Sequence, residues 1–137
     1  KLTMDDLTKT PGFTWFVAEL DRYAPSQKFV QEVQTSMTAA PSRKVCIFVR
    51  PTCSCRGTQR MFPQIMKTLR NAGVDSQRVE VWSMRNVTDK QPYSNIFSVT
   101  QLPMVFVVES NSVRASITDY DYNDANADSL IAVAVSK

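Results

Sequence analysis

The sequence predicts a single α/β domain, because short apolar runs of strand length alternate with segments of helical periodicity. Val45 to Val49 is a continuous apolar run bounded by Lys44 and Arg50, which is typical of a strand buried on both faces of a sheet. Helices and strands then alternate, which implies parallel strands, and a later hairpin adds antiparallel ones. The length of 137 residues is that of one domain. We therefore expect a central mixed sheet of about four strands.

Residues 1–41 are expected to form a helical extension packed on the domain of residues 42–137. Apolar residues recur at helical spacing from Phe13 to Tyr23. Pro25 suits the first turn of a second helix, whose apolar stripe extends to Met37. No charged or glycine-rich linker separates this part from the first strand, so we expect the extension and the domain to fold together.

The domain of residues 42–137 is expected to contain four strands and three helices. Pro63 interrupts the first of these helices, and we expect a kink there. A polar turn at residues 109–112 can join the last two strands, and Asp128 or Ser129 can cap the final helix. In chain order the expected elements are a strand at Val45–Val49, a helix at Thr58–Asn71, a strand at Arg78–Met84, a short helix at Tyr93–Phe97, strands at Met104–Val108 and Val113–Thr118, and a helix carrying Leu130, Ile131 and Val135.

The composition excludes several classes of protein. With 43% hydrophobic and 21% charged residues, the chain is neither disordered nor of low complexity. No apolar run is long enough for a membrane-spanning helix, so we expect no membrane span. The first residue is Lys1 and not Met, which favours a processed, exported or periplasmic protein over a cytoplasmic one. The oligomeric state is left open.

The kinds of chemistry open to the chain are limited because it contains no histidine. Catalytic dyads and triads built on histidine are excluded, and so is histidine-ligated metal. The three cysteines are Cys46, Cys53 and Cys55, too few for a disulfide framework. Cys46 lies in the middle of an apolar strand and is expected to be a small buried side chain. No fourth ligand accompanies these thiols, so no metal site is expected.

The charges are distributed unevenly along the chain. Seven basic residues and no acidic one occur between Arg43 and Arg70, whereas four Asp and one Lys occur from Ala115 to the end. The basic window surrounds the cysteines, so it bears on the ionisation of their thiols. Aromatic side chains are not interleaved with these basic residues as in nucleic-acid-binding surfaces, and we expect no nucleic-acid partner.

Two segments resemble the thioredoxin superfamily. The segment Phe97-Ser-Val-Thr-Gln-Leu-Pro-Met-Val-Phe106 is similar to the family's stretch that enters a strand through a cis proline, here Pro103. The segment Cys55-Arg-Gly-Thr-Gln-Arg-Met-Phe-Pro63 is similar to the family's active-site helix, with a proline eight residues after the first cysteine. The resemblance covers residues 44–137 and implies a three-layer α/β/α fold and thiol–disulfide exchange with protein substrates. It also implies that the Pro103 loop faces the catalytic cysteine.

The family's Cys-x-x-Cys motif is replaced here by Cys53-Ser54-Cys55, and this leaves two registers open. If the helix proline fixes the register, Cys55 is the nucleophile and Thr58 takes the second cysteine's place. If the first strand fixes it, Cys53 is the nucleophile, in a context that resembles glutaredoxin. Arg50, three residues upstream of Cys53, then corresponds to the family's contact with the glutathione carboxylate.

We expect Cys53 and Cys55 to form a catalytic redox pair, because the chemistry requires a thiolate and a helix N-terminus stabilises one. Arg56 and Arg60 are expected to add to that stabilisation. Two cysteines one residue apart close a small, strained ring, which makes a disulfide more reducible. The resemblance implies a substrate groove, which we assign to Thr52, Leu102 and Pro103. No cofactor is implied, although glutathione remains a possible co-substrate.

Two alternatives stay open from the sequence. The first is a redox-inactive thioredoxin-fold module for binding or assembly, with structural cysteines. The second is a monothiol, glutathione-linked protein that uses Cys53 and Arg50. The sequence does not decide between a reductant and an oxidant or isomerase, because that depends on the reduction potential of the pair.

Overall fold

The computed structural model describes residues 1–137 and contains a four-stranded mixed sheet. The order of strands in the sheet is β2-β1-β3-β4, with β1 parallel to β2 and antiparallel to β3, and with β3 antiparallel to β4. The predicted α/β class and the four-stranded mixed sheet are thereby confirmed. The strands are β1 (Arg43–Val49), β2 (Val79–Ser83), β3 (Met104–Glu109) and β4 (Ser112–Thr118).

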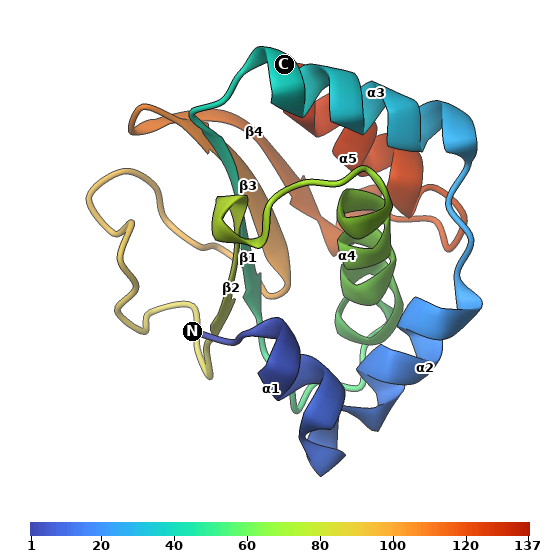
Figure 1. Ribbon diagram of the computed structural model, residues 1–137. Coiled ribbons are helices and arrows are strands. Elements are labelled where there is room, and N and C mark those ends of the chain that lie inside the picture. The colour runs from blue at the N-terminus through green and yellow to red at the C-terminus, as the bar shows by residue number, and fades with distance from the viewer.

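Five α-helices accompany the sheet, and Figure 1 shows them gathered on one side of it. Four of them correspond to predicted helices, whereas α1 had no separate prediction. It begins at a capping box in which Thr3 and Asp6 exchange hydrogen bonds between side chain and backbone. None of the helices is both long and apolar enough to cross a bilayer. The helices are α1 (Met4–Lys9), α2 (Thr14–Arg22), α3 (Gln27–Ala39), α4 (Phe62–Asn71) and α5 (Ala127–Val135).

The two faces of the sheet are covered differently. The helical face carries a core of 25 buried residues, to which Val45, Ile47 and Val49 of β1 and side chains from all five helices contribute. The opposite face, here called the loop face, carries a core of seven residues that includes Cys46 and Phe48. It is covered by residues 85–103, the long connection on the left of Figure 1. Alternate residues from Val45 to Val49 thus belong to different cores, which explains why this part of β1 is apolar throughout.

The short helix expected at Tyr93–Phe97 is absent, and that prediction is wrong. The segment forms a single turn, in which the Tyr93 carbonyl accepts the N–H groups of Ile96 and Phe97 at 2.9 and 3.1 Å. A segment of this length forms too few hydrogen bonds to offset the free-energy cost of nucleating a helix. Aromatic packing holds it instead, because the Phe97 ring stacks on Phe106 with centroids 3.9 Å apart.

The helix expected at Thr58–Asn71 is present, but its first part is a π-turn (Gly57–Met61) that precedes α4. The Phe62 N–H donates to the Gly57 carbonyl five residues earlier. Pro63 has no N–H and cannot bond to the carbonyl of Gln59, so the α-helical ladder is interrupted here. The irregularity expected at Pro63 therefore takes the form of a wider turn directly after the cysteine loop.

Neither of the predicted caps of the final helix is present. Helix α5 begins at Ala127 after Asn126, and Asp128 lies inside its first turn. The Asp128 carboxylate accepts the backbone N–H of Ser26, just before α3, at 2.9 Å. The Asp128 side chain therefore binds a segment 102 residues away in the sequence and does not form the cap of its own helix that the local sequence predicted.

Candidate functional site at the cysteine loop

The predicted redox residues lie in a loop that joins β1 to the π-turn, at the carboxyl end of β1. The Cys53 N–H donates to the Arg50 carbonyl at 2.9 Å, which makes a tight turn directly after the strand. The sulfur atoms of Cys53 and Cys55 lie at disulfide distance, and their Cα atoms are 5.4 Å apart. Both cysteines are partly exposed. The sulfur pair therefore lies at the carboxyl end of a central strand, where a partner molecule can reach it.

Both sulfur atoms lie at the positive end of a helix. The Cys55 carbonyl accepts the N–H of Gln59 at 3.0 Å, so the helical hydrogen bonds begin at Cys55 itself. The Cys55 N–H points at the Cys53 sulfur, 3.3 Å away. The Cys55 sulfur lies 3.4 Å from the hydroxyl oxygen of Thr58, which is completely buried. Each sulfur therefore has one hydrogen-bond donor beside it, in addition to the field of the helix N-terminus.

The loop before β3 packs directly against the start of this helix. The Leu102–Pro103 peptide bond is cis, and Pro103 is buried. A Cβ atom on Gly57 would lie 2.9 Å from Pro103 Cγ and 2.8 Å from Asp119 Cβ. Only a glycine lets both neighbours approach the helix so closely. Gly57 is therefore where the Pro103 loop, the segment after β4 and the cysteine loop meet.

The remaining residues of the predicted groove are less enclosed than Pro103. Leu102 is partly buried and packs against the core of the loop face, and Thr52 is exposed in the turn before Cys53. Arg50 is also exposed, and no carboxylate lies within ion-pair distance of its guanidinium. An anionic group on a partner could therefore bind to Arg50 without displacing a contact.

Arg56 is bound by the C-terminal part of the chain. Its guanidinium donates to the Asp124 carboxylate and to the Tyr122 carbonyl, both at 2.9 Å, and lies over the Tyr122 ring. Arg60 is exposed. Neither guanidinium makes a hydrogen bond to a sulfur atom, so the two charges can act on the sulfurs only through space.

Sequence reasoning missed Gly57, Asp119 and Asp124 as parts of the site. Gly57 is part of the segment that resembles the family's active-site helix, but its neighbours in space come from 46 or more residues away and leave no local signal. The sequence shows an excess of acidic residues after Ala115, and one of them, Asp124, forms an ion pair with Arg56. Thr58 was noted only as the occupant of the second cysteine's position.

Cys46 occupies a different environment, on the loop face of β1. It is completely buried, as predicted, and burial raises the pKa of its thiol to about 11. Its partner on β2 is Glu80, whose carboxylate accepts hydrogen bonds from the Tyr93 hydroxyl at 2.7 Å and the Trp82 indole at 3.1 Å. Lys44 completes the cluster with an ammonium group 3.4 Å from the same carboxylate.

No group of three or more Cys, Asp or Glu side chains is arranged to hold a metal ion. No family model, curated protein or solved structure matches this chain. What the cysteine loop can do chemically therefore has to be inferred from its own geometry.

Proposed function

We propose that this protein is a thioredoxin-like thiol–disulfide oxidoreductase that exchanges disulfides with protein substrates through Cys53 and Cys55. One observation carries the proposal: two partly exposed sulfur atoms lie at disulfide distance at the N-terminal end of a helix. The third cysteine, Cys46, is enclosed in the core of the loop face and takes no part. The chain thus separates one accessible pair from one inaccessible thiol.

The surroundings of the pair support a thiolate after reduction. The first turn of the helix presents backbone N–H groups without intrahelical partners, and these stabilise an anion. The Thr58 hydroxyl can donate to Cys55, and the Cys55 N–H can donate to Cys53. The acidic residues nearest the loop come from the C-terminal part of the chain, where Asp124 is paired with Arg56 and Asp119 lies beside Gly57. A thiolate is the species that attacks a disulfide, so these donors favour exchange.

The proposed reaction is a pair of exchange steps that moves two electrons. In the reducing direction, one loop thiolate attacks a substrate disulfide, which forms a mixed disulfide and releases one substrate sulfur as a thiolate. The other loop cysteine loses its proton and attacks the mixed disulfide, which releases the second substrate sulfur and closes the Cys53–Cys55 bond. The oxidising direction is the reverse of these steps. In either direction two electrons pass between the loop cysteines and the substrate sulfur atoms. A second protein or peptide thiol or disulfide restores the pair by the same exchange, so no bound cofactor is required.

The substrate segment is proposed to lie between the cysteine loop and the Pro103 loop. Pro103 reaches the helix start through Gly57, so a backbone lying along Leu102 and Pro103 would pass close to the sulfur pair. Thr52 is exposed on the cysteine side of this position. Hydrogen bonds between the backbone of the Pro103 loop and the backbone of an extended substrate peptide would hold the peptide there. Such binding depends little on the side chains of the peptide.

The reduction potential of the Cys53–Cys55 couple is the measurement that tests the proposal. The protein would be equilibrated with defined ratios of reduced and oxidised glutathione, and its redox state followed by thiol alkylation and mass spectrometry. We expect a potential above about −300 mV, the upper bound typical of structural disulfides. A potential well below that value, with no turnover of insulin disulfides or of a reduced peptide, would contradict the proposal and favour a binding or assembly module.

Single-cysteine variants identify the attacking sulfur. Cys53→Ser and Cys55→Ser should each lose turnover, and the variant that retains the attacking thiol should accumulate a mixed disulfide with substrate. Cys46→Ala is the matched control and should keep the turnover of the unmodified protein. Full turnover in both loop variants would mean that the pair does not perform the exchange.

A second candidate, a monothiol glutathione-linked protein, is favoured by the unpaired guanidinium of Arg50. If this second hypothesis is correct, glutathione forms a stable adduct at Cys53, and a carboxylate of the bound glutathione binds Arg50. Incubation with oxidised glutathione would give this adduct in the Cys55→Ser variant, and Arg50→Ala would weaken it. If Arg50→Ala leaves adduct formation unchanged, this candidate is excluded and the dithiol mechanism stands alone.

A further inference from the structure

A cavity of about 580 Å³ lies away from the cysteine loop, between α1, the C-terminal half of α4 and β2. This volume falls within the range of small-molecule sites. The cavity exists because α1 is short and buries only one of its residues, Leu7. The chain before α1 crosses to β2, where the Leu2 N–H donates to the Val81 carbonyl at 2.8 Å. The strap formed by residues 1–3 and α1 thus covers part of the apolar surface and leaves the rest open.

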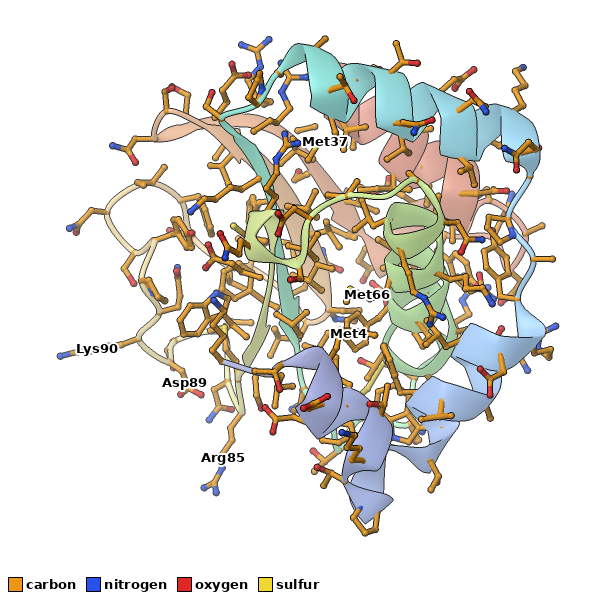
Figure 2. All side chains as sticks on the ribbon, viewed as in Figure 1. Met4, Met37, Met66, Arg85, Asp89 and Lys90 are labelled. Atoms are coloured by element: carbon orange, nitrogen blue, oxygen red, sulfur yellow. A yellow bond between two sulfur atoms is a disulfide. The ribbon has the colours of Figure 1, made fainter.

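The lining of the cavity is mainly apolar. Leu7, Leu69 and Val81 form a floor that is almost completely buried. Met4 and Met66 form walls, and Figure 2 shows them close together between α1 and α4. Methionine side chains are flexible and polarisable, so they adapt to the shape of an apolar ligand. An aliphatic chain is the occupant that such a lining accommodates best.

The rim of the cavity carries positive charge without a partner. Arg70 and Lys1 are exposed there, and no carboxylate lies within ion-pair distance of either side chain. The one acidic residue of the rim, Asp5, is bound to Lys9 at 3.5 Å. An apolar interior with free cations at the opening is complementary to a molecule with an aliphatic body and an anionic head.

We propose that this cavity binds an unbranched aliphatic carboxylate, such as a medium-chain fatty acid. The hydrocarbon chain lies between Met4 and Met66, and the carboxylate binds at Arg70. This site is separate from the cysteine loop and does not depend on the proposed exchange reaction.

Methyl NMR of the methionines, with sodium decanoate as the probe, tests the proposal. We expect saturable shifts of the Met4 and Met66 methyl signals on titration, with no shift at Met37, which belongs to α3 and does not line the cavity (Figure 2). Decanol, which has the same chain and no charge, should bind more weakly. Octanoate should bind about fifteenfold more weakly than decanoate, because it lacks two methylenes and each buried methylene contributes about fourfold.

Two variants and one control distinguish this site from adventitious binding. Arg70→Gln should weaken decanoate binding about fivefold, as expected for an exposed ion pair, and leave decanol binding unchanged. Arg85→Gln, on the exposed connection after β2, is the matched control and should change neither. Val74→Trp should block the cavity, with an unshifted Met37 signal as the check on folding. The absence of saturable shifts at Met4 and Met66, or equal decanoate affinity in the Arg70→Gln variant, would overturn the proposal.

Discussion

Cys46 and the Cys53–Cys55 pair belong to the same short stretch of chain, yet they occupy opposite chemical environments. Cys46 lies within β1, enclosed by the loop-face core, and burial raises the pKa of its thiol to about 11. Cys53 and Cys55 follow the end of β1, are partly exposed, and have N–H and hydroxyl donors beside them. The difference shows that burial within the sheet withdraws one thiol from solvent, whereas the loop after the strand leaves the other two cysteines partly exposed beside hydrogen-bond donors.

The largest expected contrast is in the rate of alkylation after reduction. The thiolate fraction falls tenfold for each pKa unit, so raising the pKa from 9.0 to about 11 lowers the reactive fraction of Cys46 about 100-fold at neutral pH. Iodoacetamide labelling at pH 7, followed by mass spectrometry, should modify at least one loop cysteine far faster than Cys46. In guanidinium chloride the rates should converge. Similar native rates for all the cysteines would remove the contrast between the two environments.

The second prediction concerns the backbone behind the sulfur pair. Gly57→Ala should destabilise the protein by about 1–3 kcal/mol, because the added Cβ would approach Pro103 Cγ and Asp119 Cβ to within 3.0 Å. Neither of these is the end of a flexible side chain, so relief requires a loop to move. Urea unfolding measures the change. Gly12→Ala, where no atom lies within 4 Å of the new Cβ, is the control and should cost less than about 0.5 kcal/mol.

These two regions also show what the sequence could predict. The apolar run of β1 was sufficient to place Cys46 in the core, because a strand that is apolar throughout has both faces covered. The position of Cys53 and Cys55 between a strand and a helix followed from the same local patterns. The wrong predictions, a helix at Tyr93–Phe97 and caps at Asp128 or Ser129, concern short segments whose conformation depends on distant partners.

The contacts of the candidate site were beyond the reach of local patterns. Arg56 was assigned to the sulfurs because it adjoins Cys55, but its guanidinium binds Asp124 and Tyr122, 68 and 66 residues later. The approach of Pro103 to Gly57 depends on the antiparallel register of β1 and β3. The family resemblance implied that the Pro103 loop faces the cysteine loop, but which residues meet there is set by the tertiary fold.

The third prediction probes the polar cluster beside Cys46. Tyr93→Phe should lower the free energy of unfolding by about 1–2 kcal/mol at pH 7, because the hydroxyl donates to the charged Glu80 carboxylate at 2.7 Å. Tyr120→Phe is the matched control: that ring is 88% exposed, and removing its hydroxyl should change stability by less than about 0.5 kcal/mol. Equal effects of the two substitutions would mean that the cluster does not hold residues 85–103 on the sheet.

The same cluster gives a pH dependence with a definite sign. Burial raises the pKa of Glu80, but the hydrogen bonds from Tyr93 and Trp82 and the charge of Lys44 outweigh it, and the net pKa lies below 4.5. The stabilisation from the ionised form is therefore present above pH 4.5 and is lost as the pH falls through the lower, folded-state pKa. Unfolding curves measured from pH 7 downwards should show a smaller acid-induced loss of stability in Glu80→Gln than in the unmodified protein.

The smallest effect is expected at Arg56, and it tests whether this arginine acts on the thiolate at all. Asp124 has a φ of 73°, a conformation that Asn adopts readily, so Asp124→Asn should remove the ion pair without disturbing the loop. Because both partners are about half exposed, the loss of stability should be less than about 1 kcal/mol. Freed from its carboxylate, the Arg56 charge should lower the pKa of the attacking loop thiol slightly, whereas Arg56→Gln should raise it. The pH profile of thiol alkylation in the two variants measures both shifts. If they move in the same direction or do not move, Arg56 serves only to anchor the C-terminal segment, and the helix N-terminus with Thr58 must account for thiolate stabilisation.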